Sequence, residues 1–212
     1  MDFVSIQFIC FVCIAVLLYY VFPSKKRWWI ILLSSIVFYG LNGKIYLLYI
    51  AVTTVITWLA ARGFGYLDSK LEKSISGLED KELIARQKTK NKRLKKLVML
   101  ITLLAALGLL GYTKYTNFII SNINLFTKAE FDTIDNIIVP LGVSFYTFMS
   151  IGYMLDVYWK KYEPEKNLLK YATFITYFPH IVQGPIDRYN KLAPDIIVAQ
   201  LSRQKYEIFI MN

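Results

Sequence analysis

Residues 97–112 read LVMLITLLAALGLLGY and contain no charged side chain. A helix needs about 20 apolar residues, or about 17 at the short end, to cross the hydrocarbon core of a bilayer. Three further apolar runs, 3–22, 45–61 and 137–159, are as long or longer, and Asp156 is their one charged residue. A water-soluble domain rarely contains so many long apolar helices without charged residues. The sequence therefore predicts an all-α, polytopic membrane protein.

The composition agrees with this class. The chain is 56% hydrophobic and 16% aromatic, with a mean hydropathy of +0.41, yet its formal net charge is +10. In a soluble protein that charge would suggest a nucleic-acid partner. Here the Lys and Arg residues lie between the apolar runs, as the positive-inside rule predicts, and no basic stripe outside the runs carries interleaved stacking aromatics. We therefore predict membrane lipids, and no nucleic acid, as partners.

The basic residues also predict how the chain crosses the bilayer. Residues 25–27 are Lys, Lys and Arg, which places the end of the first run on the cytoplasmic side. Segment 62–96 holds eleven Lys and Arg against five Asp and Glu, so it is cytoplasmic as well. We expect residues 1–212 to form one multi-pass domain in a bacterial plasma membrane. The predicted spans are about 3–22, 28–40, 45–61, 97–112, 137–159 and 168–183.

The cytoplasmic segment 62–96 shows helical periodicity. Glu82 and Arg86 add an i,i+4 ion pair. These features favour a basic amphipathic helix in the headgroup layer, attracted to anionic lipid, with a mobile charged loop as the alternative. The apolar residues at steps of four, four and three are Leu67, Leu71, Ile75 and Leu78.

Two features of the apolar runs have both a chemical and a structural interpretation. Cys10 and Cys13 form a C-x-x-C pair, a spacing used in redox and metal sites. Because a thiolate in lipid is very costly, we interpret them as ordinary residues of an apolar helix and predict no metal site. Asp156 is an intramembrane acid, which by default suggests function. Its position beside Lys160 indicates the cytoplasmic interface and favours structural pairing with a cation.

After Val139 the apolar segments contain more small, hydroxylated and helix-breaking residues. Small and hydroxylated residues within 137–159 let helices approach closely in lipid, so we expect this helix to be buried in protein. Further on, Pro179 and the pair Gly184-Pro185 interrupt the apolar segment. Such backbone at membrane depth suits a re-entrant segment that lines a tunnel, while an ordinary helix end at the interface is the alternative. The candidate tunnel or substrate-path residues are Gln183, Gly184, Pro185, Asp187 and Arg188.

Three motifs in this region resemble the membrane-bound O-acyltransferase (MBOAT) family. They are Pro140-Leu-Gly-Val-Ser-Phe-Tyr-Thr-Phe148, Gly152-Tyr-x-x-Asp156-Val-Tyr158 and Tyr177-Phe-Pro-His-Ile-Val-Gln-Gly-Pro-Ile-Asp-Arg-Tyr189. Within that family the chain is most similar to the alginate O-acetyltransferase branch. The relative that moves D-alanine toward teichoic acid shares the Gly-Pro-Ile-Asp-Arg-Tyr string and is the nearest rival.

The resemblance implies an enzyme that takes an acyl group from a thioester or acyl carrier on the cytoplasmic side. The group would pass through a central tunnel to a hydroxyl of an exported polysaccharide or polymer, which partner proteins help to supply. No bound cofactor is implied, and the acyl donor is a co-substrate.

The family's catalytic histidine is the main departure. In the family it lies after the Gly-Pro motif, and it suits acyl transfer because imidazole can take the acceptor's proton near neutral pH. The one histidine here is His180, which lies inside the motif and does not match that position. We expect the catalytic residue beyond Asn212, and the chain to be the N-terminal part of a longer enzyme. A transporter, or a non-catalytic membrane scaffold built on segment 62–96, is the alternative from another class.

Cysteine labelling of intact cells tests the predicted topology. In a variant with Cys10 and Cys13 replaced by Ser, a single cysteine at position 124 should react with an impermeant maleimide. A cysteine at position 80 should react only after lysis, because the charge distribution places it inside. Efficient labelling at position 80 but not at position 124 in intact cells would contradict the assignment.

Overall fold

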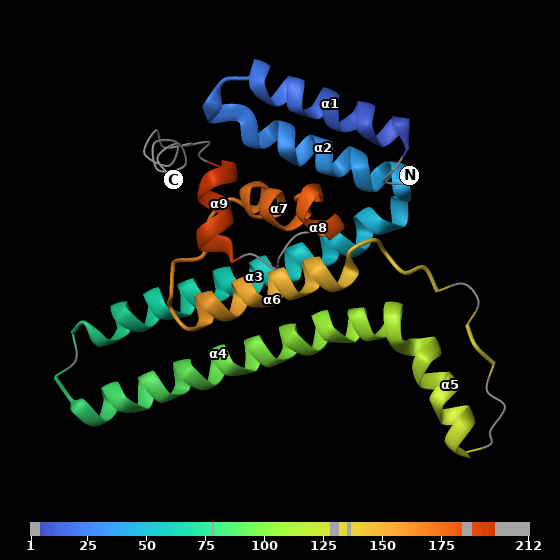
Figure 1. Ribbon diagram of the computed structural model, residues 1–212. Coiled ribbons are helices and arrows are strands. Elements are labelled where there is room, and N and C mark those ends of the chain that lie inside the picture. The colour runs from blue at the N-terminus through green and yellow to red at the C-terminus, as the bar shows by residue number, and fades with distance from the viewer. Residues whose placement is uncertain (1–4, 78, 128–131, 135–136, 184–187, 198–212) are drawn as a thin grey trace, which may run out of the picture. The chain divides into compact units, whose positions relative to one another are not determined.

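The computed structural model describes residues 5–77, 79–127, 132–134, 137–183 and 188–197, and all regular structure in them is helical (Figure 1). This confirms the all-α fold class. The chain divides into two compact units, which comprise residues 1–51 with 167–212, and residues 52–166. The helices are α1 Ile6–Val21, α2 Arg27–Asn42, α3 Lys44–Ile75, α4 Lys81–Leu110, α5 Thr116–Thr127, α6 Val143–Tyr158, α7 Leu168–Thr176, α8 Phe178–Gln183 and α9 Tyr189–Ile197.

Two helical stretches are long and apolar enough to cross a membrane. They are α3 and the continuous stretch 81–127, which consists of α4, a π-helical turn and α5. Helix α1 is also apolar but has 16 residues, which at 1.5 Å per residue is shorter than a hydrocarbon core of about 30 Å. The described residues thus contain two candidate membrane-spanning helices, and the six-span topology stays a prediction.

The first unit packs around α2. Helices α1, α7, α8 and α9 all contact it, and α1 lies next to α2 in Figure 1. The side chain of Phe38 is fully buried at the centre, where its ring centroid lies 5.4 Å from that of Phe178. Phe11 of α1 meets Phe178 edge to face at 5.5 Å. Aromatic contacts of this kind fix the packing of α1, α2 and α8 beyond what apolar burial alone supplies.

A break between α7 and α8 agrees with the predicted effect of Pro179. Helix α7 begins after Asn167, whose side chain accepts hydrogen bonds from the backbone N–H groups of residues 169 and 170. It ends at Thr176, and Tyr177 leaves the helical conformation with φ −54° and ψ 96°. Proline lacks an N–H, and its ring clashes with the carbonyl four residues earlier, so α7 cannot continue through Pro179. In the first turn of α8 the same residue is tolerated.

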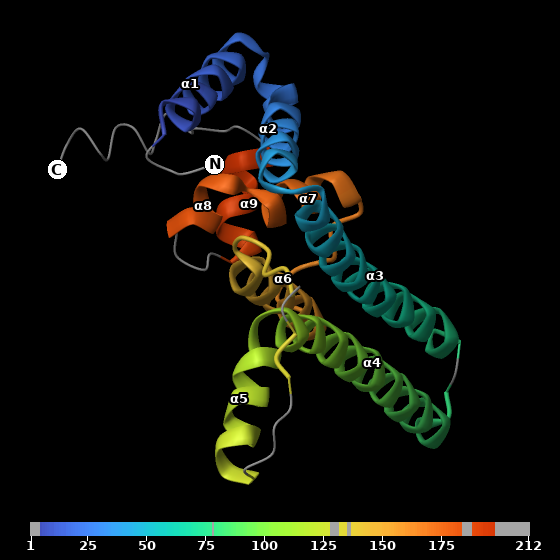
Figure 2. The same ribbon diagram turned by 90° about the vertical axis from the view of Figure 1, so that its right-hand side faces the viewer.

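In the second unit, α3 and α4 form an antiparallel hairpin (Figures 1 and 2). This differs from the predicted single amphipathic helix over 62–96, because that segment forms the end of α3 and the start of α4. The physical reason is Asp80, whose carboxylate accepts the N–H groups of Glu82 and Leu83 and so starts a new helix at Lys81. The predicted Glu82–Arg86 ion pair is confirmed at 3.0 Å.

The helical stretch after α4 is longer than predicted. We expected the span to end near residue 112 and a polar stretch to follow, but a π-helical turn over 111–115 leads directly into α5, which bends away from α4 (Figure 1). The hydroxyl of Thr113 donates to the carbonyl of Leu109 at 3.0 Å. Insertions of this kind into the backbone ladder, together with π-turns, are established causes of helix bends.

Helix α6 packs on α4 and is buried along most of its length. It begins at Val143, later than the predicted start at 137, because Gly142 adopts a left-handed conformation with φ +69° directly before it. The hydroxylated residues Thr147 and Ser150 are 1% and 0% exposed. The prediction that this helix is buried in protein is therefore confirmed.

Candidate functional site

The predicted tunnel residues lie at the edge of the described structure. Gln183 is the last residue of α8. Gly184, Pro185 and Asp187 lie outside the described residues. Arg188 is exposed, and its carbonyl accepts hydrogen bonds from the backbone N–H groups of residues 191 and 192 at the start of α9. Their role along a substrate path stays a prediction.

The other singled-out side chains have identifiable surroundings. His180 lies on α8, with its ring 5.2 Å from the ring of Tyr177. Cys10 and Cys13 are both exposed on α1. Within the described ranges, no group of three or more His, Cys, Asp or Glu residues is placed to hold a metal ion.

Asp156 pairs with a cation as predicted. Its carboxylate lies 2.6 Å from the ammonium of Lys161, and only 7% of its side chain is exposed. The two groups sit on either side of the C-terminal end of α6, where the N–H of Lys161 also bonds to the carbonyl of Asp156. The ion pair thus stabilises the turn by which the chain leaves α6.

The segment that follows α6 is held against α3. The indole N–H of Trp58 donates to the carbonyl of Glu165 at 2.9 Å, and the N–H of Glu165 donates to the hydroxyl of Tyr153 at 2.8 Å. Pro164 lies so close to α3 that a Cβ added to Gly65 would approach its ring to 2.8 Å. Only glycine permits this approach, so residues 159–166 occupy a defined position over α3.

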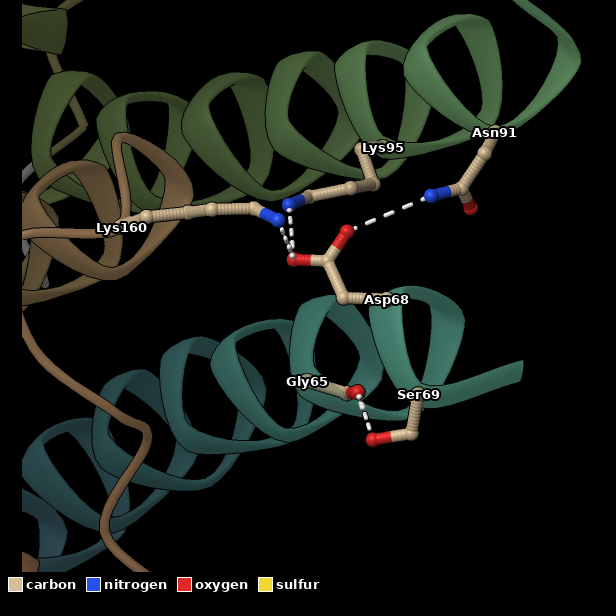
Figure 3. Close-up of polar contacts among 6 residues, drawn as sticks. All are labelled: Gly65, Asp68, Ser69, Asn91, Lys95 and Lys160. Atoms are coloured by element: carbon tan, nitrogen blue, oxygen red, sulfur yellow. Dashed lines mark hydrogen bonds and ion pairs between the residues drawn. The ribbon is translucent and has the colours of Figure 1, made fainter. Parts of the chain in front are cut away.

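These contacts bring an ion cluster together around one carboxylate (Figure 3). Asp68 on α3 accepts from the ammonium of Lys95 on α4 at 2.7 Å and from the side-chain amide of Asn91 at 3.3 Å. The ammonium of Lys160, just after α6, lies 3.4 Å from the same carboxylate oxygen that Lys95 contacts. The next residue of α3 is Ser69, whose hydroxyl donates to the Gly65 carbonyl one turn earlier and takes no part in the cluster.

Lys95 is the most enclosed cation of the cluster. Only 7% of its side chain is exposed, against 20% for Asp68. Its ammonium also lies 5.6 Å from the ring centroid of Phe64 and 5.7 Å from that of Tyr158. A carboxylate and two aromatic faces therefore replace most of its hydration, which is the condition for burying a charge without a large penalty.

Lys160 has an unusual backbone conformation. Its φ is +58°, the one positive value among the described non-glycine residues. It follows the end of α6, where its N–H bonds to the carbonyl of Val157 and that of Lys161 to the carbonyl of Asp156. Glycine usually occupies this position of a helix end, because a Cβ is disfavoured there. Lysine at this position instead supplies a second cation to Asp68.

Two cavities adjoin the cluster. One of about 270 Å³ is lined by four lysines and one carboxylate, together with Leu71, Asn91 and Tyr158. Its charged residues are Lys88, Lys92, Lys95, Lys160 and Asp68. The other, of about 590 Å³, has three cationic and three acidic lining residues and is therefore electrically balanced. The smaller cavity thus suits an anion, and the larger one a polar ligand without a marked net charge.

Sequence reasoning missed this cluster. Segment 62–96 was interpreted by its overall positive charge, which does not distinguish Asp68 from the other four acidic residues of the segment. A usable signal existed, since Lys88, Asn91, Lys92 and Lys95 recur at steps of three, one and three and so share one helical face. That face includes polar side chains where a packed helix would place apolar ones.

Part of the chain is similar to curated O-acetyltransferases. The probable alginate O-acetylase AlgI of Pseudomonas fluorescens is 36% identical over 78 residues, which are 35% of this chain and 16% of that protein. The protein of the same description in Pseudomonas aeruginosa is 44% identical over 57 residues, 27% of this chain and 11% of that protein. A peptidoglycan O-acetyltransferase of Helicobacter pylori is 28% identical over 102 residues, 37% of this chain and 19% of that protein.

Part of this chain is thus homologous to MBOAT-type O-acetyltransferases. This confirms the resemblance seen in the sequence motifs. The matched stretch spans less than a fifth of the length of each of these curated relatives. No family-wide sequence profile and no solved structure matches the chain. Within the described residues, the Asp68 cluster is the most clearly formed polar site.

Replacing Asp68 with Asn should destabilise this unit by about 3 kcal/mol, because removing one partner leaves the enclosed Lys95 ammonium without its carboxylate. Thermal unfolding of the chain in detergent measures the loss. Adding Lys95→Met to Asp68→Asn should recover part of it, since the unpaired charge is then gone.

The exposed Glu82–Arg86 pair on the same hairpin is the matched control. Both of its side chains are about three-quarters exposed, so Glu82→Gln should cost only about 0.3–0.5 kcal/mol. Equal losses for Asp68→Asn and Glu82→Gln would show that burial does not strengthen the Asp68 pair.

Proposed function

We propose that this chain is part of a membrane O-acyltransferase that moves an acetyl group onto a hydroxyl of an exported polysaccharide. The partial homology to alginate and peptidoglycan O-acetyltransferases carries the proposal. Both kinds of relative are named for acetyl transfer to a carbohydrate polymer, which favours acetyl over D-alanyl transfer. The candidate membrane-spanning helices α3 and 81–127 support placement in a cell membrane.

The reaction requires one bond exchange. The acceptor hydroxyl attacks the carbonyl carbon of a thioester, a C–O bond forms, and the C–S bond breaks to release a thiol. A base takes the hydroxyl proton, and the leaving sulfur receives a proton. Histidine suits both proton transfers near neutral pH. We propose that this histidine lies beyond residue 212 and that a cytoplasmic thioester or acyl carrier protein is the donor.

The described part of the third motif is anchored on both sides. Phe178 lies in the aromatic core formed with Phe11 and Phe38. At the other end, the ring of Tyr189 meets that of Phe174 edge to face at 5.1 Å. Phe178 before the Gly184-Pro185 pair and Tyr189 after it are therefore both fixed by packing within the first unit. A segment that lines a substrate path needs such fixed ends. We propose Gln183, Asp187 and Arg188 as the polar residues of that path.

Residues 1–212 by themselves should show no acyl transfer, because His180 does not match the position of the family's catalytic histidine. Membranes containing the chain are incubated with a radiolabelled acetyl thioester and de-acetylated alginate, and label in the polymer is counted. A boiled sample gives the background. Transfer above this background that His180→Ala abolishes would show that His180 is the base.

Replacing both Gly184 and Pro185 with Ala should greatly reduce acetyl transfer while leaving the protein folded. Glycine and proline both disfavour a helix, and alanine in their place would favour one by about 1 kcal/mol or more in helix propensity. The assay is alginate O-acetylation by a chimera in which residues 1–212 replace the corresponding part of the Pseudomonas aeruginosa protein.

The unmodified chimera must first restore acetylation in a strain that lacks the native protein, and the amount in the membrane is compared by blotting. An exposed change elsewhere in the same unit, Leu41→Ala, is the matched control. Full activity of the double variant, or a loss explained by poor membrane insertion, would favour an ordinary helix end over a tunnel.

A further inference from the structure

The lysine-lined cavity beside Asp68 has an excess of positive charge that the protein does not neutralise. Four lysines and a single carboxylate line it. That carboxylate is already shared between Lys95 at 2.7 Å and Lys160 at 3.4 Å. Among the described residues, Lys88 and Lys92 form no ion pair. We propose that this cavity binds a phosphate group, carried either by an anionic lipid headgroup or by a soluble phosphate-bearing molecule.

The cavity is a formed site because the backbone fixes its walls. Lys88, Lys92 and Lys95 lie at i, i+4 and i+7 of α4 and so face one direction. Between them, Asn91 is 9% exposed and donates its amide to Asp68, which sets the side of α4 that meets α3. Figure 3 shows Lys95, Asn91 and Lys160 converging on Asp68 from two elements. Lys88 and Lys92 are exposed at the rim of the cavity, and Lys95 is buried at its inner wall.

The conformation of Lys160 is a second, independent observation. A lysine with φ +58° costs energy that glycine would avoid at the same helix end. The strained backbone places the Lys160 ammonium at a carboxylate that Lys95 already pairs with. Lys160 thus adds a second cation at a carboxylate that already has one, on the side where the smaller cavity holds no other acid. An anion in the cavity gives it a counter-charge.

Size and chemistry match a phosphate group. A volume of about 270 Å³ is close to the lower limit of about 300 Å³ for sites of drug-sized ligands, so it suits a small headgroup. Each ammonium offers three donors as a compact point charge, and phosphate offers several acceptor oxygens. The cavity also lies in the basic part of the hairpin, which the charge distribution places on the cytoplasmic side, where the leaflet surface is anionic. The acetyl-transfer proposal does not require this site.

Binding to two probes tests the proposal with the full 212-residue chain. In the first arm, the chain in phosphatidylcholine nanodiscs is titrated with inorganic pyrophosphate by calorimetry. In the second arm, native mass spectrometry measures retention of phosphatidylglycerol relative to phosphatidylcholine by the chain in detergent. The test variant is Lys88→Gln with Lys92→Gln. Lys90→Gln with Lys96→Gln is the matched control, because these lysines are exposed on the same helix and do not line the cavity.

We expect the test variant to weaken binding about 10- to 30-fold, since each lysine near an anionic partner contributes about fivefold. The control should stay within about twofold of the unmodified chain. Lys88→Arg with Lys92→Arg should retain binding, which separates charge from helix stability, and circular dichroism checks the helical content of each variant.

The two arms distinguish the source of the phosphate. If the test variant loses binding of phosphatidylglycerol only, the ligand is a lipid headgroup. If it loses binding of pyrophosphate only, the ligand is soluble. Loss of binding to both probes shows that the cavity recognises the phosphate group itself. Equal weakening by the test and control variants, or no binding of either probe by the unmodified chain, would overturn the proposal. Both arms measure ligand binding, so their outcome does not depend on whether the chain takes part in acetyl transfer.

Discussion

A carboxylate that is largely buried needs cations close to it. In residues 52–166 this requirement fixes how α3, α4 and the chain after α6 are arranged. Asp68 on α3 faces Lys95 on α4 and Lys160 after α6. Desolvation costs several kcal/mol per ion and is repaid only at short range and good geometry. Sliding α4 along α3 by one residue would turn Lys95 away and leave its ammonium unpaired. The ion cluster therefore sets the register of the hairpin, which apolar contacts alone would leave open.

The same requirement connects the fold to a possible ligand. Gly65 lets Pro164 approach α3, and the hydrogen bond from Trp58 to Glu165 holds the following chain in place. Lys160 is thereby brought to an oxygen that already has a partner. Structural packing thus creates a surplus of positive charge beside a cavity. In the predicted topology this positive charge lies on the cytoplasmic side, where anionic headgroups and soluble phosphates are both within reach.

In the first unit, aromatic packing has the equivalent role. Phe38 is enclosed by rings from α1 and α8, and this core includes Phe178, near the start of the third sequence motif. The motif's described end is held by Tyr189 against α7. Because close packing has few alternative arrangements, rings of this size give the motif a fixed frame. The proposed acyl-transfer path depends on that frame more than on any single polar residue.

The sequence by itself determined the helical class, because long uncharged apolar runs can satisfy their backbone only as helices. It also determined the pairing of Asp156 with a cation, the burial of α6 and the family resemblance, since each depends on residues close together in the chain. Only the tertiary structure decided that segment 62–96 is a hairpin, that the helix after α4 continues to Thr127 and that Asp68 meets Lys95 and Lys160. These features depend on one cap, one π-turn and contacts across tens of residues. The periodicity of a short stretch of sequence does not reveal such contacts. Their energy arises only when side chains far apart in the chain are buried together.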